Sequence, residues 1–422
     1  MKLALKGGGK VRKKPFFKWP MFDQCEEKGL LEVLESRRWF SGYLGGDPGS
    51  KVAEFERKFA QYQGAKYAMA VASGAAALEV TLRSLGIGAG DEVIVPAYTF
   101  IATATAVMNV NAVPIIVDIE PNHLCIDPEA TVKAITFHTK AVIPVHYGGQ
   151  IADMEKLIQI AAENNLIIIE DAAHAHGSMW KGKRAGTFGK AGCFSFQESK
   201  TITAGEGGII LTDDDGLARR ARSYRSNGRE EDRPGYEHHR LGWNYRLTEF
   251  QAAILLAQLP RLEDQVKTRT KNANYLSQEL RKIPGFKPIT DPPGTELNGH
   301  YLYSVIYEKQ ELEGVKRDKV IEALRAEGIP CQGGYLPINR SPMFKKENWE
   351  KAGMSFYSRF LEREFDVSKI KTPIADETFE KIIEFPQHLL LGDKEDIDDI
   401  VKACQKVSEN ASELRFSTPT FF

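Results

Sequence analysis

The sequence predicts an α/β fold with a mainly parallel central sheet, helices on both faces of that sheet, and a smaller α+β C-terminal domain. From residue 67 onward, short apolar runs alternate with longer stretches whose apolar residues recur at helical spacing. Several short runs are almost continuously apolar, such as Ile167–Ile169. Such runs are typical of strands that helices cover on both sides, as in a parallel sheet.

Strands are expected throughout the first half of the chain. They cover Tyr67–Ala72, Glu92–Pro96, Pro114–Asp118, Ala141–Val145, Leu166–Glu170, Gly192–Phe196 and Gly208–Thr212. Amphipathic stretches between them predict helices at Ala75–Leu85, Phe100–Asn109 and Ala152–Asn164. This alternation of strand and helix is the pattern that produces parallel neighbours in a sheet.

A second unit is expected after residue 283. A long helix is predicted from Thr248 to about Lys282, and prolines and glycines then cluster at 284–294. Beyond them, we expect a strand at Tyr301–Tyr307 and helices at Lys316–Glu327 and Asp396–Ser408. The predicted division is an N-terminal arm and helix at 1–50, a large α/β domain at 51–283 and a small α+β domain at 284–422.

Composition excludes several classes of function. The 422 residues include 56 Lys or Arg and 57 Asp or Glu, with a formal net charge of −1, so the basic excess of a nucleic-acid binder is missing. The 5 cysteines never occur in C-x-x-C spacing, which disfavours a disulfide framework or a zinc site and favours a reducing compartment. No run is long and apolar enough to span a bilayer. We expect a cytoplasmic protein without a metal, a nucleic acid or a membrane as partner.

A phosphate site is the first candidate feature. The segment Ser73–Ala76 follows a predicted strand and opens a predicted helix. Its small side chains would let an anion approach bare backbone N–H groups at the positive end of the helix dipole. A tight strand-to-helix turn without a ligand is the alternative interpretation of this segment alone.

A carboxylate at a strand end is the second candidate feature. Asp171 follows the apolar strand that ends at Glu170, where open α/β sheets place their ligands. Burying it is costly unless it faces a cation, although a helix cap or an ion pair with arginine would also satisfy it. His174 and His176 lack a third ligand at a sensible spacing, so they predict no metal site. We expect His176 to be packed and hydrogen-bonded.

The third candidate feature is Lys200, which follows the strand ending at Phe196 and precedes a glycine-rich segment at 205–208. A lysine in such a loop can lose its hydration, which lowers the pKa of its amine and makes it nucleophilic. By itself, a solvated surface lysine is the simpler interpretation. The ordered set of phosphate cradle, buried carboxylate and reactive lysine is, however, what pyridoxal phosphate requires.

These stretches resemble the DegT/DnrJ/EryC1/StrS family of sugar aminotransferases, which are fold type I pyridoxal-phosphate enzymes. The matching stretches are Ser73–Leu78, Asp91–Ala102, Asp118, Pro144–His146, Glu170–Gly177, Phe194–Gly208 and Gly242–Ala253. The resemblance begins near residue 20 and continues to the C-terminus.

The resemblance implies that Lys200 forms the Schiff base with pyridoxal 5′-phosphate and moves the proton during amino transfer. It implies that Asp171 pairs with the pyridine nitrogen and that Phe100 stacks on the cofactor ring. His174 would lie beside the ring hydroxyl, where glutamine is common in the family, and it can still donate a hydrogen bond there.

The resemblance also implies how the phosphate is held. The backbone amides of Gly74, Ala75 and Ala76 and the hydroxyl of Ser195 would bind it, with Ala75 in place of the usual threonine. Asn244 falls where the family reaches the same phosphate from a second subunit, which implies a homodimer with shared active sites.

Further likenesses indicate the substrates. His174, the segment 195–197, Gly334–Pro337 and His388–Gly392 resemble glutamine-dependent inosose aminotransferases and 3-amino-5-hydroxybenzoate synthases. We expect amino transfer from glutamine or glutamate to a ketosugar or keto-cyclitol. The candidate substrate contacts are Tyr43, Trp180, Arg229, His238 and Tyr335.

Other functions remain open at this point. A nucleotide-linked ketosugar aminotransferase and a 3-amino-5-hydroxybenzoate-type synthase would use the same residues on different substrates. A non-catalytic regulator that binds pyridoxal phosphate is disfavoured because Lys200, Asp171 and Phe100 are all retained. A dehydrogenase-type nucleotide-binding module is disfavoured because the glycine fingerprint after the first strand is missing.

Overall fold

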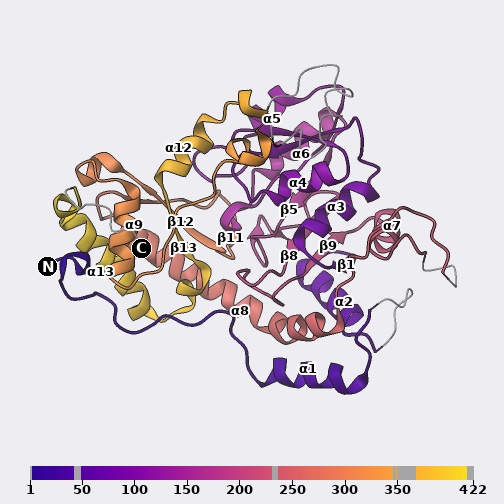
Figure 1. The fold of residues 1–422 in the computed structure, drawn as a ribbon, viewed down its shortest axis with the longest axis horizontal. Helices are drawn as coiled ribbons and strands as arrows, with labels where there is room; N and C mark the ends of the chain where they lie inside the picture. Colours follow the sequence, from indigo (N-terminus) through magenta and orange to yellow (C-terminus); the bar gives the residue numbers. More distant parts are fainter. Residues whose placement is uncertain (1, 42–48, 231–235, 346–347, 349–366, 416–422) are drawn as a thin grey trace.

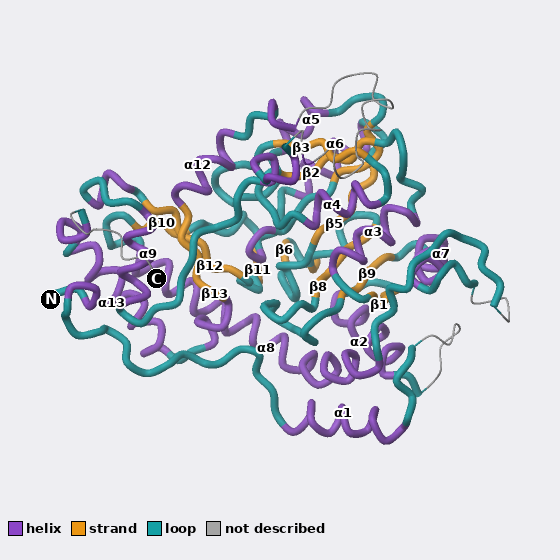
Figure 2. The backbone as a smooth tube through the Cα atoms, in the orientation of Figure 1, coloured by secondary structure: helices purple, strands orange, loops and turns teal. Residues whose placement is uncertain are grey.

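The computed structural model describes residues 2–41, 49–230, 236–345, 348 and 367–415. A seven-stranded sheet lies at the centre of the larger part of the molecule (Figures 1 and 2). Its strands are β1 (Tyr67–Val71), β2 (Glu92–Pro96), β3 (Val113–Val117), β4 (Thr139–Val142), β5 (Ile167–Asp171), β8 (Ala191–Ser195) and β9 (Gly208–Thr212). They match the seven strands predicted from the sequence, each to within a few residues.

The order of the strands is β1-β9-β8-β5-β4-β2-β3. The pairs β2–β3, β2–β4, β4–β5 and β5–β8 are parallel, whereas β9 runs antiparallel to both β8 and β1. The prediction of a mainly parallel sheet is therefore confirmed, with β9 as the exception. A parallel arrangement places the carboxyl ends of β2, β4, β5 and β8 at one edge of the sheet.

Helices cover both faces of this sheet. The connections through α3 (Gly74–Ser84) and α4 (Ala102–Asn109) lead in one direction along the sheet, and those through α5 (Pro128–Ala134) and α6 (Met154–Glu163) lead back. Because such crossovers are right-handed, the two pairs of helices lie on opposite faces. The contacts of α3 with α4 and of α5 with α6 agree with this arrangement.

Further helices flank the sheet. Helix α2 (Lys51–Gln63) packs on β1, and α7 (Asp215–Arg225) packs on α3 and β1. The long α8 (Glu249–Leu280) begins with a capping box formed by Thr248 and Gln251. Helix α1 (Gln24–Ser36) lies along α8 (Figure 1).

The smaller part of the molecule is built on a three-stranded antiparallel sheet. Its strands are β10 (Phe286–Pro288), β12 (Leu302–Tyr307) and β13 (Ile382–Pro386), in the order β10-β12-β13. Its helices are α9 (Arg317–Ala326), α12 (Pro373–Lys381) and α13 (Lys394–Glu409). A further small sheet joins β6 (Met179–Trp180), β7 (Lys183–Arg184) and β11 (Thr295–Leu297).

Two hydrophobic clusters form the interior. The larger surrounds the central sheet, and the smaller holds Val305 and Ile383 together with Leu3 from the N-terminal segment. Helix α8 contributes to both clusters, and Ile338 and Phe344 pack in the larger one. The division at residue 283 therefore stays a prediction, because chain on each side of it enters both clusters.

Among the described helices, none combines the length and apolar character needed to cross a membrane.

Candidate active site

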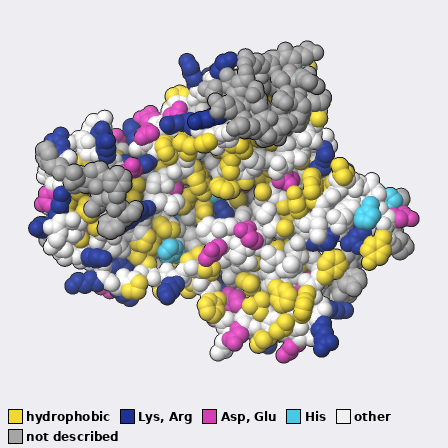
Figure 3. Space-filling view, viewed as in Figure 1, with side chains coloured by type: hydrophobic (Ala, Val, Ile, Leu, Met, Phe, Trp, Pro, Cys, Tyr) yellow, Lys and Arg dark blue, Asp and Glu magenta, His cyan; other side chains and the backbone are white. Residues whose placement is uncertain are grey.

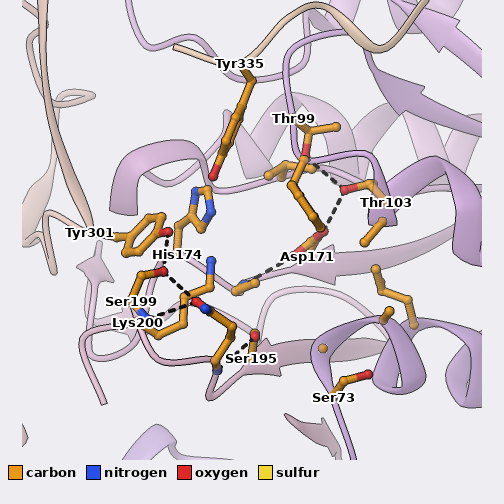
Figure 4. Close-up of a pocket in the computed structure, with 18 of the residues that line it drawn as sticks. Ser73, Thr99, Thr103, Asp171, His174, Ser195, Ser199, Lys200, Tyr301 and Tyr335 are labelled. Atoms are coloured by element: carbon orange, nitrogen blue, oxygen red, sulfur yellow. Dashed lines mark hydrogen bonds between the residues drawn. The ribbon is translucent and has the colours of Figure 1, made fainter. Parts of the chain in front are cut away.

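A cavity of about 420 Å³ lies at the carboxyl ends of the parallel strands. Figure 4 shows polar and aromatic side chains converging on it from several elements. Its lining consists of Ser73, Gly74, Ala75, Leu78, Thr99, Phe100, Ala102, Thr103, Val145, Asp171, Ala173, His174, Ser195, Gln197, Ser199, Lys200, Glu206, Tyr301 and Tyr335. The structure thus brings together eight of the residues predicted from sequence, which are Gly74, Ala75, Phe100, Asp171, His174, Ser195, Lys200 and Tyr335.

The N-terminus of α3 forms one wall of the cavity. Ser73 caps the helix by accepting a hydrogen bond from the N–H of Ala76 at 3.1 Å. The first amides of a helix have no acceptor within the helix, so those of Gly74 and Ala75 can bind an anion. A Cβ atom at Gly74 would lie 2.7 Å from the Cβ of Ser195, so only glycine lets β8 approach this closely.

Asp171 ends β5 and lies 7 % exposed in the cavity wall. Its Oδ2 accepts a hydrogen bond from the hydroxyl of Thr103 at 2.8 Å, and its Oδ1 accepts one from the N–H of Ala173 at 3.2 Å. The Thr103 hydroxyl is in turn 2.9 Å from that of Thr99. Burial raises the pKa of Asp171, whereas these hydrogen bonds and the charge of Lys200 act in the opposite direction. A cationic partner in the cavity would therefore stabilise the carboxylate.

Lys200 lies in the same cavity and is 8 % exposed. Burial lowers the pKa of its amine to about 7, and the charge of Asp171 opposes that shift. The Nζ atom lies 4.0 Å from the centroid of the Tyr301 ring. A large part of this amine is therefore neutral and nucleophilic at neutral pH, which is unusual for lysine.

His174 lies 4 % exposed between Lys200 and the aromatic side of the cavity (Figure 4). Its ring is 4.2 Å from the Tyr301 ring at an interplanar angle of 35°. Its Nδ1 accepts a hydrogen bond from the N–H of Gly148 at 3.3 Å. Burial holds the pKa of His174 well below its usual range. In this neutral ring, Nε2 therefore carries the proton and can donate a hydrogen bond.

Aromatic rings complete the wall. Phe100 is 56 % exposed, and its ring centroid is 6.1 Å from that of Tyr335. Tyr301 hydrogen-bonds through its hydroxyl to that of Ser199 at 2.8 Å. Ser199 also donates to Oε1 of Gln197 at 2.6 Å. The cavity thus offers apolar ring faces together with hydroxyl and amide groups.

Other predicted site residues lie outside the described lining. Asn244 is exposed beyond α7, where it pairs with Ser226 through a backbone bridge. Arg229 donates to the Ser226 hydroxyl at 3.0 Å, and Nδ1 of His238 is 2.7 Å from the Asn227 carbonyl oxygen. Their predicted roles in binding stay predictions.

Three further residues need separate comment. Trp180 belongs to β6 of the small β11-β6-β7 sheet, is 6 % exposed and donates through Nε1 to the Pro293 carbonyl oxygen at 2.8 Å. The amide of Ala76 is already bonded to the Ser73 cap. Tyr43 lies outside the described residues.

Sequence reasoning missed several lining residues. Thr99 and Thr103 follow β2 with a spacing of four residues, which places them on one face of the turn that leads into α4. This spacing of four residues is the sequence pattern from which both threonines could have been predicted to lie together. Gln197 and Glu206 lie within the matched stretch Phe194–Gly208, although neither was singled out. Tyr301 carried no such signal, because the tertiary fold brings it to the cavity from the second half of the chain.

The arrangement can act on a small ligand with three distinct groups. The amides of α3 fit an anion, Asp171 fits a protonated ring nitrogen, and Lys200 can add to a carbonyl group. The neutral His174 and the rings of Phe100 and Tyr335 fit the edge and faces of a flat ring. The residues present therefore fit pyridoxal 5′-phosphate.

Comparison with known proteins agrees with this chemistry. Residues 24–405 match the DegT/DnrJ/EryC1/StrS aminotransferase family. One relative is a Streptoalloteichus tenebrarius protein named as an L-glutamine:3-amino-2,3-dideoxy-scyllo-inosose aminotransferase. The chain is 39 % identical to it over 422 residues, which cover 98 % of this chain and 99 % of the relative. It is 37 % identical over 425 residues, 98 % of each chain, to the L-glutamine:2-deoxy-scyllo-inosose aminotransferase of Streptomyces kanamyceticus.

Solved structures show the same fold. The 3-amino-5-hydroxybenzoic acid synthase aligns with a TM-score of 0.82 at 32 % identity, covering 94 % of this chain and 100 % of that one. DesV of S. venezuelae, in complex with a ketimine intermediate, aligns with a TM-score of 0.78 at 33 % identity, covering 91 % and 94 %. The fold is therefore that of the fold type I aminotransferases, and the chain belongs to the DegT/DnrJ/EryC1/StrS aminotransferase family.

Proposed function

We propose that this aminotransferase uses pyridoxal 5′-phosphate to move an amino group from glutamine, or glutamate, to a keto-cyclitol of the inosose class. The observation that carries the proposal is a buried amine, Lys200, with a pKa of about 7, in one cavity with Asp171 and the start of α3. The names of the full-length relatives support the choice of glutamine and an inosose as substrates.

Each group of the cofactor has a matching partner in the chain. The N–H groups of Gly74 and Ala75 and the hydroxyl of Ser195 would hold the phosphate. Asp171 would keep the ring nitrogen protonated, and Lys200 would bind the aldehyde carbon. When bound, pyridoxal phosphate supplies an electron-poor ring that takes up the electrons left on an amino acid's α-carbon after its proton is removed.

Lys200 then moves that proton. An amine with a pKa of about 7 accepts a proton and returns it with little free-energy difference at neutral pH, which suits a group acting as base and then as acid. The burial of Lys200 excludes water from the amine, and Tyr301 confines its Nζ from one side. His174 would donate its Nε2 proton to an oxygen on the ring edge.

The polar lining supports a neutral polyol as the acceptor. Gln197, Ser199, Thr99 and Tyr301 offer hydroxyl and amide groups, and Glu206 offers a carboxylate. Among the described lining residues Lys200 is the single cation, whereas a diphosphate would favour arginines or further lysines. These side chains favour a cyclitol over a nucleotide-linked ketosugar.

A homodimer is part of the proposal. Asn244 is exposed and lies outside its own cavity, which fits a role in a neighbouring site. Exposed apolar side chains gather on α1 and next to it (Figure 3). They include Phe22, which is 79 % exposed, and Leu31, Leu34 and Trp39, each of which is about half exposed. Patches of this kind mark interfaces. We propose that a second copy of the chain covers this surface and supplies Asn244.

Mixing inactive variants tests the shared site. In a hybrid of one Lys200→Ala chain and one Asn244→Ala chain, the site that lacks the amine also lacks Asn244, and the second site keeps both residues. Refolding the two variants together should restore part of the activity, because a hybrid dimer has one intact site. Monomeric mass by light scattering, or no recovery on mixing, would contradict the shared site.

Spectroscopy tests the cofactor. Purified protein should be yellow, and borohydride should attach pyridoxal phosphate to the peptide that contains Lys200. Lys200→Arg, which retains the charge, and Lys200→Ala should both lose the covalent adduct and amino transfer. A colourless Lys200→Ala protein with undiminished amino transfer would refute the proposal.

A substrate panel tests the acceptor. Scyllo-inosose, 2-deoxy-scyllo-inosose, 3-amino-2,3-dideoxy-scyllo-inosose and a nucleotide-linked ketosugar would each be incubated with glutamine and analysed by mass spectrometry. We expect an amine product from at least one inosose. Activity on the nucleotide-linked ketosugar alone would refute the cyclitol assignment, and binding of cofactor with no amine product would identify a regulator.

A further inference from the structure

A buried carboxyl group on the smaller three-stranded sheet lies behind the residues that line the cavity. Glu384 lies on β13 and is 0 % exposed. Its Oε1 accepts the hydrogen bond that the Tyr147 hydroxyl donates. Its Oε2 has no hydrogen-bond partner among the described residues. One side-chain pair therefore joins the smaller sheet to the loop that follows β4.

Tyr147 is the link between this carboxyl group and the cavity. Its ring centroid lies 5.7 Å from that of His174 in an edge contact and 6.0 Å from that of Tyr335 at 89°. The next residue, Gly148, donates its N–H to Nδ1 of His174. The Tyr147–Gly148 segment thus controls both the packing of His174 and the nitrogen on which its proton resides.

The turn that contains Tyr147 is held at its other end by close packing. Gly148 has a φ of +64° and Gly149 a φ of +108°, which favours glycine at both positions. A Cβ atom at Gly149 would lie 2.3 Å from Oδ1 of Asn298. With one end fixed in this way, the hydrogen bond to Glu384 decides where the Tyr147 side chain lies.

The surroundings of Glu384 contain few groups that could neutralise it. Burial raises its pKa to about 7, while the hydrogen bond from Tyr147, the polar side chain of Gln332 and the charge of Arg317 act in the opposite direction. The hydroxyl of Tyr98 is also close and lacks a described hydrogen-bond partner. A carboxyl group with one unpaired oxygen is costly to bury, so it is not explained by stability alone.

We propose that Glu384 is a positioning residue of the active site, acting through Tyr147 and Gly148 on the ring of His174. The proposal goes beyond the assigned chemistry, because Glu384 lines no part of the cavity. Only its consequence for cofactor affinity rests on the proposed function.

Nuclear magnetic resonance of the cofactor-free full-length protein tests the coupling. With ¹⁵N-labelled histidine, His174→Gln identifies the His174 signals, and spectra are recorded between pH 6 and 8. The spectra are recorded in a Lys200→Met background, because the Lys200 amine lies in the same cavity as His174 and also has a pKa of about 7. In this background we expect the His174 signals to shift with a midpoint near pH 7, following Glu384. In Glu384→Gln, which retains an acceptor for Tyr147 but does not titrate, the shift should vanish. Superimposable titrations in the two proteins would overturn the proposal.

Tyr147→Phe provides a second variant that keeps the ring and removes only the hydroxyl. Loss of this hydrogen bond should abolish the pH-dependent shift of His174 and raise the Kd for pyridoxal phosphate about three- to tenfold, measured by tryptophan fluorescence. Unchanged His174 signals in Tyr147→Phe would overturn the proposal even if Glu384→Gln failed to fold. If the wild type bound no pyridoxal phosphate, the proposed function would be refuted. The resonance experiment would still test the coupling of Glu384 to His174, because it uses cofactor-free protein.

Glu327 provides the matched control. It is also a fully buried glutamate near the second sheet, but it pairs with Lys406 at 2.8 Å and accepts from N–H groups of the N-terminal segment. Glu327→Gln should lower the unfolding temperature and leave the His174 titration unchanged. If Glu327→Gln removed the shift as well, the effect would be general destabilisation and the proposal would be wrong.

Discussion

Two neighbouring carboxylates on β5, Glu170 and Asp171, differ in how fully the chain satisfies them. Glu170 is 0 % exposed and accepts hydrogen bonds of 2.6 Å from three backbone N–H groups within 186–189. The Nε2 of His146 donates a further bond of 2.8 Å. Successive strand residues face opposite sides, so these two side chains point to different surroundings.

From the described residues, the Asp171 side chain accepts one side-chain and one backbone hydrogen bond, from Thr103 and Ala173. It lines the cavity, and burial raises its pKa. A carboxylate has about four acceptor positions, so Asp171 keeps capacity for a ligand that Glu170 has already used on the chain. Of these two carboxylates, the one that faces the cavity is the one that the fold leaves incompletely satisfied, and this difference marks Asp171 as the functional member.

The largest expected effect comes from Asp171→Asn. The amide retains the shape and can still accept from Thr103, but it cannot stabilise a protonated ring nitrogen. We expect kcat to fall by about 10³-fold, because a buried charge opposite the reacting ring is removed. Single-turnover kinetics would measure the loss, and the unfolding temperature should fall less than in Glu170→Gln, because one N–H group, that of Ala173, loses its acceptor. An active Asp171→Asn enzyme would break the comparison.

Much of this arrangement could be predicted from the sequence. Asp171 comes shortly after the apolar run Ile167–Ile169, and Lys200 follows the mostly apolar strand at 192–196, so both side chains were expected at the same edge of a parallel sheet. The segment Ser73–Ala76 similarly combines a strand end with a helix start. These features depend on local patterns of two to four residues, which sequence carries.

Features that depend on distant contacts could not be predicted. Strand β13 and its Glu384 meet Tyr147 across 237 residues of sequence, and no local pattern records that meeting.

His176 was expected to be packed and hydrogen-bonded. It is packed, with ring centroids 5.2 Å from Phe194 and 5.6 Å from Phe196, but its ring nitrogens have no hydrogen-bond partner within the described ranges.

Glu170→Gln should have the second-largest effect, on stability. The new NH₂ group would face backbone N–H donors of 186–189, so at least one buried donor loses its acceptor. We expect the free energy of unfolding to fall by about 2–4 kcal/mol, measured by urea denaturation. Cofactor affinity per folded molecule should be unchanged. A Glu170→Gln protein that is fully stable but loses cofactor would reverse the assignment of the two carboxylates.

Two buried lysines extend the comparison to the cationic side. Lys406 is 3 % exposed and ion-paired with Glu327, whereas Lys200 faces the cavity with a pKa lowered by burial to about 7. Below that pKa the Lys200 amine is protonated and cannot add to an aldehyde. Its rate of labelling by pyridoxal and borohydride should therefore rise about tenfold per pH unit up to pH 7 and level off above it.

Peptide mapping separates this signal from other lysines. Exposed lysines, whose amines titrate near their usual pKa, should continue to gain reactivity up to about pH 10. Lys406 should remain unlabelled in the folded protein because its amine is buried and paired. A Lys200 profile that rises in parallel with the exposed lysines would contradict the lowered pKa.

The smallest effect is expected at His176, two residues beyond His174. Burial lowers the pKa of His176 to about 3, so its ring is neutral, and it packs against the rings of Phe194 and Phe196. Replacing it with phenylalanine removes unpaired polar atoms and adds little volume, so the free energy of unfolding should change by less than about 1 kcal/mol. His174→Phe should instead weaken binding of pyridoxal phosphate, and it also removes the acceptor of the Gly148 N–H. If His176→Phe weakened cofactor binding as much as His174→Phe does, the assignment of His174, and not His176, as the histidine that contacts the cofactor would be wrong.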